Sequence, residues 1–289
     1  MDFTIEVIVK IVMALGVAFI ISFIATPVVK SFAVQVGAID IPDAKRHIHK
    51  HPIPRMGGLA IFIGFLLSVL FFAEISTQVR GILIGAILIV VVGAIDDVLN
   101  LNAWLKFGIQ IIAAVIAVLS GVIINVVSNP LLITSEQAVT IGILAVPVTI
   151  LWIVGVTNSV NLIDGLDGLA CGVSAIASMT MLVVSLLVSD ANINVAVILA
   201  ALVGGCLGFI PYNLNPAKIF MAIPAHCFWA IFWRRCPLSE CSSSTPSSPL
   251  SCRCSRWPFR FRILYLPSHA ASCTDRAPSM PTGGISTTS

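Results

Sequence analysis

Charged side chains are scarce in this sequence. Of its 289 residues only 10% are Asp, Glu, Lys or Arg, whereas 58% are hydrophobic, and the mean hydropathy is +1.04. A water-soluble domain carries about 25% charged residues. A soluble core of this size could not bury so much apolar surface, so we expect lipid to be the solvent for most of the chain.

Cysteines are rare in most of the chain, and its first residues do not have the pattern of a signal peptide. Residues 1–221 contain only Cys171 and Cys206, each inside an apolar run, which argues against disulfide bonds or a zinc site there and favours helix packing. The chain begins with Asp2 and Glu6 in place of the basic residues of a signal peptide, so we expect no cleaved leader.

Long apolar runs recur along residues 1–221. They predict membrane helices over residues 4–30, 57–74, 80–95, 104–125, 138–156, 168–189 and 193–212. The second and third of these are short for a membrane span. The expected fold class is an all-α, polytopic integral membrane protein with about seven transmembrane helices.

Basic residues fall mainly on alternate loops between these helices. The first loop holds Lys45, Arg46 and Arg55, the third holds Lys106, and Lys218 follows the last helix, whereas the loops between them carry few. Cytoplasmic loops carry an excess of Lys and Arg, so we expect the odd-numbered loops in the cytoplasm and the N-terminus outside. The acidic pairs of the membrane region fall on the same side.

Two adjacent carboxylates, Asp96 and Asp97, close the third apolar run. Such a pair stays ionised most easily beside a cation, and Mg²⁺ is often bound by one or two carboxylates together with substrate phosphates. The simpler alternative is a solvated helix end with two ordinary acids.

A denser polar segment separates the fifth and sixth apolar runs. Residues 157–169 read Thr-Asn-Ser-Val-Asn-Leu-Ile-Asp-Gly-Leu-Asp-Gly-Leu, with Asn158 and Asn161 three residues apart and Asp164 and Asp167 three apart. At helical spacing each pair shares one face. An Asx-rich turn is the simpler alternative, but such a turn needs one Asx and one Gly and not a repeated Asp-Gly.

Two further segments border the apolar runs. Residues 43–58 form a basic, proline-kinked loop that runs into Gly57 and Gly58 at a helix start. Exposed amides at a helix N-terminus and nearby basic side chains favour phosphate, although a cytoplasmic loop alone would explain the sign of the charge. After the last helix, residues 212–221 read Tyr-Asn-Leu-Asn-Pro-Ala-Lys-Ile-Phe-Met, which alone would be an ordinary exit from the membrane.

These segments together resemble the polyprenyl-phosphate N-acetylhexosamine-1-phosphate transferase family. The resemblance rests on the Pro-Arg-Met-Gly-Gly loop, the Asp-Asp pair, the Asn-x-x-Asn-Leu-Ile-Asp-Gly-Leu-Asp-Gly-Leu segment and the Asn-Pro-Ala-Lys-Ile-Phe-Met segment. The residues of these motifs are more similar to those of the branch that uses UDP-N-acetylglucosamine (UDP-GlcNAc) in teichoic acid, O-antigen or related glycan assembly. It departs at Asn100, where many relatives have a basic residue after the Asp pair.

The resemblance implies a bacterial plasma-membrane enzyme with cytoplasmic active-site loops. It would transfer N-acetylglucosamine-1-phosphate from UDP-GlcNAc to undecaprenyl or another polyprenyl phosphate, release UMP, and use Mg²⁺, with Mn²⁺ as the alternative ion. No nucleic-acid partner is expected, and a homodimer is left open. Asp96 and Asp97 are then candidates for metal coordination or for taking a proton from the lipid phosphate. The other catalytic candidates are Asp164 and Asp167, and the substrate-binding candidates are Asn158, Asn161, Lys45, Arg46, Arg55 and Lys218.

Two other functions are weighed against this one. A membrane transporter would place charges or a broken helix near the bilayer midplane, and Pro147 inside the fifth apolar run is the feature that favours it. The second alternative is a phospho-N-acetylmuramoyl-pentapeptide transferase of the same family.

The last quarter of the sequence changes in composition. After Met221 lysine disappears, seven arginines appear, and serine, proline and cysteine crowd together with Trp and Phe, which are not typical of disorder. The resembling family continues after Phe-Met with Gly-Asp-Thr-Gly-Ser and another apolar span. If one base is missing after codon 221, the codons permit Gly-Asp-Thr-Gly-Ser-Leu-Phe-Leu-Gly-Tyr-Phe-Leu-Ala, and they force leucine across His226-Cys227 and glycine across Trp229-Ala230.

The far end of the chain agrees with the same shift. Residues 281–289 permit Ala-Asp-Arg-Arg-His-Leu-His-His-Gln, which resembles a cytoplasmic histidine motif of the family. We therefore expect residues 1–221 to form a truncated transmembrane transferase domain and residues 222–289 to be a frameshifted tail without a domain. The chain as written is then expected to be inactive.

Overall fold

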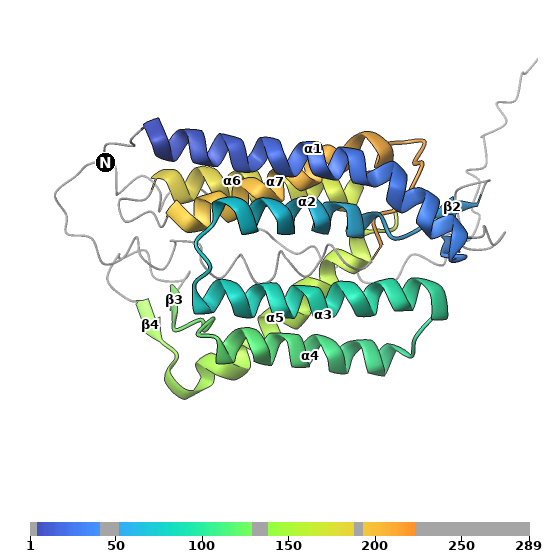
Figure 1. The fold of residues 1–289 in the computed structure, drawn as a ribbon. Coiled ribbons are helices and arrows are strands. Elements are labelled where there is room, and N and C mark those ends of the chain that lie inside the picture. Colours follow the sequence, from blue (N-terminus) through green and yellow to red (C-terminus); the bar gives the residue numbers. More distant parts are fainter. Residues whose placement is uncertain (1–4, 41–51, 129–137, 188–192, 223–289) are drawn as a thin grey trace, which may run out of the picture. The chain divides into compact units, whose positions relative to one another are not determined.

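The structure is a computed structural model that describes residues 5–40, 52–128, 138–187 and 193–222. These residues form seven α-helices, α1 (Ile5–Gln35), α2 (Gly57–Phe72), α3 (Thr77–Leu99), α4 (Ala103–Leu119), α5 (Ala145–Ile163), α6 (Leu169–Leu187) and α7 (Ile193–Asn213) (Figure 1). Two short antiparallel pairs, β1 (Ile39–Asp40) with β2 (Ile53–Pro54) and β3 (Val126–Ser128) with β4 (Ala138–Thr140), and the 3-10 turn η1 (Gly142–Leu144) complete them. The predicted all-α, polytopic membrane fold is confirmed.

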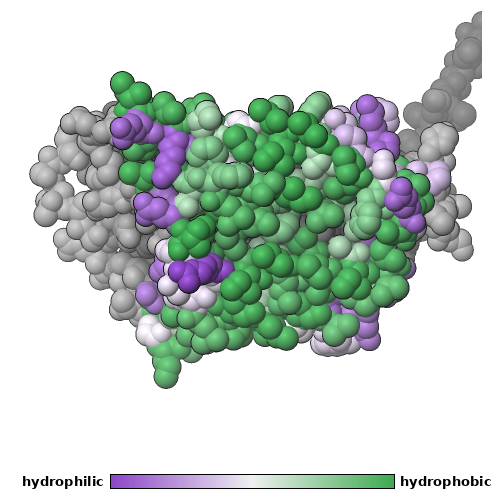
Figure 2. Space-filling view, in the orientation of Figure 1, coloured by the Kyte–Doolittle hydropathy of each residue, from purple (hydrophilic) through white to green (hydrophobic). Residues whose placement is uncertain are grey.

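Five helices are long and apolar enough to cross a membrane: α1, α3, α5 together with η1, α6 and α7. The other two, α2 and α4, are apolar but have only 16 and 17 residues. In Figure 2 apolar side chains cover the middle of the visible face, and hydrophilic residues gather toward its left and right ends. This distribution suits a lipid environment around the middle of the helices.

The predicted lengths of the third and fourth helices were wrong. Helix α3 has 23 residues. It starts early because the Ser76 side chain accepts a hydrogen bond from Val79 N–H at 3.3 Å, and it continues to Leu99, where Asn100 caps it with a left-handed φ of 49°. Helix α4 stops at Leu119, well before the predicted end at residue 125.

Helix α5 lies further along the chain than the predicted range 138–156. Residues 138–140 form β4, so the helix starts at Ala145 and continues to Ile163. Pro147 consequently falls in its first turn, where a missing N–H does no harm. Asn158 and Asn161 therefore lie on a helix, and not in the loop expected between two spans.

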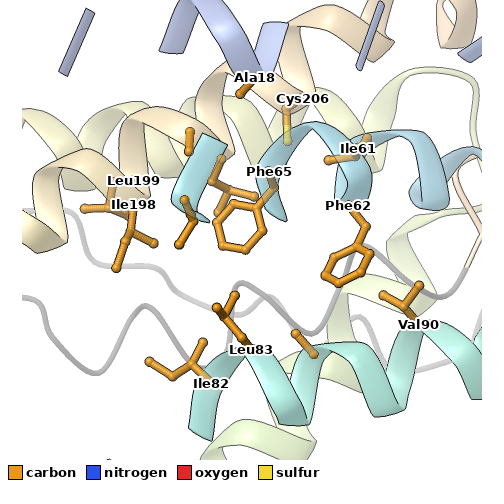
Figure 3. Close-up of a cluster of buried hydrophobic side chains, with 14 of the residues drawn as sticks. Ala18, Ile61, Phe62, Phe65, Ile82, Leu83, Val90, Ile198, Leu199 and Cys206 are labelled. Atoms are coloured by element: carbon orange, nitrogen blue, oxygen red, sulfur yellow. The ribbon is translucent and has the colours of Figure 1, made fainter. Parts of the chain in front are cut away.

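Helix α7 packs against α1, α2 and α6, while α3, α4 and α5 contact one another in sequence (Figure 1). A Cβ atom added at Gly204 or Gly208 would collide with carbonyl oxygens of α1, so both glycines let the two backbones approach closely. Ser22 Oγ of α1 donates a hydrogen bond to the Gly205 carbonyl at 2.8 Å. In Figure 3, Phe62 and Phe65 point from α2 toward α3.

Candidate functional site

Among the predicted site residues that the structure describes, Asp96, Asp97, Asp164 and Arg55 lie where the C-terminal ends of α3, α5 and α7 meet the N-terminal end of α2, at the right of Figure 1. Three parts of the chain supply them: the last turn of α3, the loop after α5, and the junction between β2 and α2. Because the helices alternate in direction, residues far apart in the sequence reach the same end of the bundle.

Asp96 is held by two hydrogen bonds. Its Oδ1 atom accepts from Leu101 N–H at 2.8 Å, and its Oδ2 atom forms an ion pair with Lys106 Nζ at 3.0 Å. The side chain is only 7% exposed. Lys106 is thus the counter-ion that the departure at Asn100 had put in question. The sequence places Lys106 in the same predicted loop as Asp96 and Asp97 but does not reveal the ion pair, although a cap at Asn102 would bring the first turn of α4 back beside the end of α3.

Asp97 has no such partners. Its Oδ2 atom is buried and, within the described part of the chain, receives no hydrogen bond. The carboxylate interacts electrostatically with Arg55, Asp96 and Lys106. Arg55 is 37% exposed and also forms an ion pair with Asp40 at 3.0 Å, a residue that the motifs did not single out. A buried acceptor without a protein donor has room in its hydrogen bonding for a water, an ion or a ligand.

Asp164 follows the last residue of α5 and is half-buried. Burial raises the pKa of its carboxyl group from the usual 3.8 to about 7, and the nearby Asp97 charge acts in the same direction. A hydrogen bond from the backbone of Ala222 and the charge of Arg55 oppose this shift. The structure therefore brings together Asp97, Asp164 and Arg55, as the alternating spans predict.

Asp167 has different surroundings. Its Oδ2 atom accepts hydrogen bonds from the Asn215 side-chain amide at 3.0 Å and from Ala217 N–H at 3.1 Å. Both donors belong to the segment after α7. Both acids of the Asp-Gly repeat therefore accept hydrogen bonds from the segment after α7, but Asp164 also interacts with the charges of Asp97 and Arg55.

The amide side chains differ in the same way. Asn158 donates to Gln110 Oε1 of α4 at 2.7 Å and to the Val154 carbonyl at 2.8 Å, so its amide group is used between helices. Asn161 is exposed. The Gln110 side chain, missed by sequence analysis, is buried and explains why a polar Asn is tolerated in α5.

The predicted basic contacts are described only in part. Lys218 is exposed, and its backbone N–H donates to the Tyr212 carbonyl at 2.9 Å. Lys45 and Arg46 lie outside the described residues. Arg55 is therefore the basic candidate that the structure places beside the acids.

The amides at the start of α2 are already used. Gly57 N–H donates to the Phe220 carbonyl at 2.9 Å, and Gly58 N–H donates to the Met221 carbonyl at 2.5 Å. The expectation that they are exposed for phosphate was wrong, because the segment after α7 folds onto this helix end. Close packing explains why position 57 is a glycine, because a Cβ there would collide with the Phe209 ring and the Phe220 carbonyl oxygen.

Gly57→Ala is consequently expected to destabilise the protein by about 1–3 kcal/mol, because overpacking shifts side chains and backbone. Thermal unfolding of the detergent-solubilised full chain would measure this. Gly155→Ala is the matched control, since a Cβ at this helical glycine of α5 meets no atom within 4 Å. An equal loss of stability in both variants would contradict the packing role of Gly57.

The donor set fits a hard divalent cation in a limited way. Within the described ranges no group of three His, Cys, Asp or Glu side chains is placed to hold a metal ion. Mg²⁺, however, is commonly bound by one or two carboxylates, with phosphate and water oxygens as the other ligands. Asp97 with its unpartnered oxygen and Asp164 beside it fit that smaller requirement.

Comparison with known proteins gives a consistent result. Residues 79–222 match the model of glycosyl transferase family 4. The chain is 42% identical over 218 residues to a probable undecaprenyl-phosphate N-acetylglucosaminyl 1-phosphate transferase of Bacillus subtilis (strain 168), covering 75% of this chain and 59% of that relative. It is 37% identical over 223 residues to a decaprenyl-phosphate N-acetylglucosaminephosphotransferase of Mycolicibacterium smegmatis, covering 71% and 53%.

A second group of relatives is less similar but is covered more fully. The phospho-N-acetylmuramoyl-pentapeptide-transferase of Thermoanaerobacter sp. (strain X514) is 32% identical over 222 residues, with 73% of this chain and 70% of that relative covered. The chain thus spans just over half the length of the N-acetylglucosamine-phosphate transferases it matches.

Proposed function

Because this chain belongs to glycosyl transferase family 4, we propose that its membrane region is built to transfer N-acetylglucosamine-1-phosphate from UDP-GlcNAc to a polyprenyl phosphate, with release of UMP. The choice of sugar rests on identity, which is 42% and 37% for the N-acetylglucosamine-phosphate transferases and 32% for the pentapeptide transferase. Undecaprenyl phosphate is the proposed acceptor, and the reaction is proposed to initiate the synthesis of a cell-wall or surface polysaccharide.

The observation that carries the proposal is the buried, unpartnered Asp97 carboxylate beside Asp164 and Arg55. In the transfer, an oxygen of the lipid phosphate attacks the phosphorus bonded to the sugar. The bond from that phosphorus to the bridging oxygen breaks, and UMP leaves with the electron pair. Asp97 would accept the proton of the lipid phosphate, while the Arg55 guanidinium would stabilise negative charge on the transferring group.

Asp97 and Asp164 are the residues proposed to hold Mg²⁺, or Mn²⁺ in its place. Such an ion would supply electrostatic stabilisation of the diphosphate. It would also favour the ionised form of Asp164, whose pKa burial raises. Asp96, fixed by Lys106, would keep the neighbouring Asp97 in place.

We also propose that the gene of this chain has lost one base after codon 221. Two observations support this beyond the codon reading. The family match ends at residue 222, and Ala222 adopts a left-handed φ of 54°, a conformation that favours glycine. Glycine is the residue that the restored frame permits there when the reinstated base is G. The tail itself, residues 223–289, lies outside the described part of the structure, and sequencing the coding DNA across codon 221 tests the proposal.

The loops that carry Asp164 and Arg55 are proposed to face the cytoplasm of a bacterial plasma membrane. In intact cells, a membrane-impermeant maleimide is expected to label Glu74→Cys, at the opposite end of the helices, but not Gly165→Cys. Both changes would be made in a background without native cysteines. Labelling of the cysteine at position 165 with none at position 74 would show that the protein has the opposite orientation in the membrane.

The function is tested with purified frame-restored protein, made from a gene with the missing base reinstated. UMP release from UDP-GlcNAc with undecaprenyl phosphate and Mg²⁺ is the expected result. Release only with UDP-N-acetylmuramoyl-pentapeptide would favour the pentapeptide-transferase alternative. Uptake of a labelled solute into vesicles without UMP release would favour a transporter. The structure does not support the broken helix that Pro147 suggested for a transporter, because Pro147 lies in the first turn of α5.

A further inference from the structure

Helix α4 holds polar side chains of both neighbouring helices from one face. Lys106 and Gln110 are four residues apart, so their side chains leave the same face of α4 one turn from each other. The Lys106 ammonium group pairs with Asp96 of α3 at 3.0 Å. One turn further into the bundle, Gln110 Oε1 accepts a hydrogen bond from Asn158 Nδ2 of α5 at 2.7 Å. The helices that carry the acids of the site are thus both held by side chains of α4.

The contact with Gln110 determines which way the Asn158 amide faces. An asparagine has two donors on Nδ2, and Asn158 directs that nitrogen at Gln110 Oε1 and at the Val154 carbonyl, 2.8 Å away. Exchanging the amide oxygen and nitrogen would set an oxygen against both acceptors and lose both hydrogen bonds. Asn158 Oδ1 therefore faces away from them, and within the described part of the chain it has no hydrogen-bond donor. The side chain is only half-buried, so this oxygen remains available as an acceptor.

We propose that Gln110 is a positioning residue, which orients the Asn158 amide so that its Oδ1 atom accepts a hydrogen bond from a hydroxyl or N–H group of the UDP-sugar. Asn158 precedes Asp164 by six residues, or about 9 Å along a helix, so its amide lies within reach of a substrate bound at the acids. Gln110 is 8% exposed and acts only through the asparagine. This role rests on the proposed function, because it names a contact of the same site.

Two substitutions of Gln110 separate positioning from packing. Gln110→Met has a similar length but no acceptor for Asn158, whereas Gln110→Glu keeps a side-chain oxygen that accepts the same hydrogen bond. In the frame-restored protein, Gln110→Met is expected to lower kcat/KM for UDP-GlcNAc by about 10–100-fold, because a misplaced contact group commonly costs up to that factor. Gln110→Glu is expected to stay within about threefold of the parent. A melting temperature that falls in Gln110→Met while kcat/KM stays parental would overturn the proposal and leave Gln110 a packing residue.

A double-mutant cycle with Asn158→Ala shows whether Gln110 acts through the asparagine. Asn158→Ala is expected to lose at least as much kcat/KM as Gln110→Met, and the double variant is expected to lose no more than Asn158→Ala alone. Losses that simply multiply would overturn the proposal, because Gln110 would then act by another route. Mg²⁺ also binds amide oxygens. A loss in Gln110→Met that excess Mg²⁺ restores would overturn the substrate contact and assign Asn158 Oδ1 to the ion.

Thermal unfolding of the detergent-solubilised 289-residue chain tests the contact without any activity. Gln110→Met and Asn158→Ala are each expected to lower the melting temperature, and the double variant by less than the sum of the two shifts. If the frame-restored parent releases no UMP, the proposed function fails, and additive shifts in this cycle would still overturn the positioning of Asn158. If Gln110→Met does not fold, Gln110→Asn replaces it with the same expected losses, because its amide is one methylene too short to reach Asn158.

Discussion

Asp97→Asn is expected to lower the turnover of the frame-restored protein by about 10²–10⁴-fold, the range typical of a lost general base, while its thermal unfolding stays close to that of the parent. The unpartnered Oδ2 atom of Asp97 contributes no hydrogen bond to the described fold. An amide in its place would even relieve the repulsion between Asp97 and Asp96. The charge of Asp97 is therefore needed for binding or proton transfer but not for packing, and UMP release with melting in detergent measures both.

Asp96→Asn is the matched comparison. An asparagine cannot keep the ion pair with Lys106, and a buried pair that loses one partner leaves an uncompensated charge. This variant is expected to lose thermal stability as well as turnover. Near-normal turnover in Asp97→Asn would remove that carboxylate from the mechanism, and equal destabilisation in both variants would give Asp97 a structural role.

The contrast between these neighbours marks what the sequence can predict. The alternation of spans was enough to expect Asp97, Asp164 and Arg55 at one end of the helices, because each apolar run reverses the direction of the chain. It could not tell that Asp96 is held by Lys106 while Asp97 has no donor. That difference depends on the turn between α3 and α4, where Asn100 and Asn102 end one helix and begin the next.

Reinstating the base that we propose to be missing after codon 221 is expected to raise UMP release by at least about 100-fold over the 289-residue chain, since losing a single preorganised charged or polar group commonly costs 10²–10³ in turnover. Ala222 donates its backbone hydrogen bond to Asp164, so the change of frame begins at a residue that touches the site. In the restored reading an aspartate follows the glycine at position 222, directly after the amide that binds Asp164. Purified protein of both kinds, assayed side by side with Mg²⁺, provides the measurement.

Ala222→Gly in the unrestored chain is the control for this comparison. It supplies the glycine that the left-handed backbone favours but none of the residues that follow in the other frame. It is expected to stay as inactive as the parent chain. Turnover of the unrestored chain comparable to that of the frame-restored protein would show that residues 223–289 are dispensable for the site.

Contacts between distant segments were beyond prediction for a related reason. Apolar runs predict where helices occur, but no periodic pattern in residues 212–221 shows that Phe220 and Met221 cover the amides of Gly57 and Gly58. From sequence alone, the Pro-Arg-Met-Gly-Gly segment suggests a phosphate loop because the glycines stand at a helix start. Their close approach to another segment becomes visible only when the Phe209 ring and the Phe220 carbonyl are placed beside them.

The tight pairing of α1 with α7 also constrains how the protein is made. The hydrogen bond from Ser22 to Gly205 joins residues 183 positions apart. At about 5–20 residues per second, the ribosome needs roughly 10–40 s to supply the second partner after the first. During that interval the small-residue face of α1 rests against lipid or the insertion machinery. A nascent chain that stalls before Gly205 would therefore leave its first helix without its final neighbour, and would be open to membrane quality control.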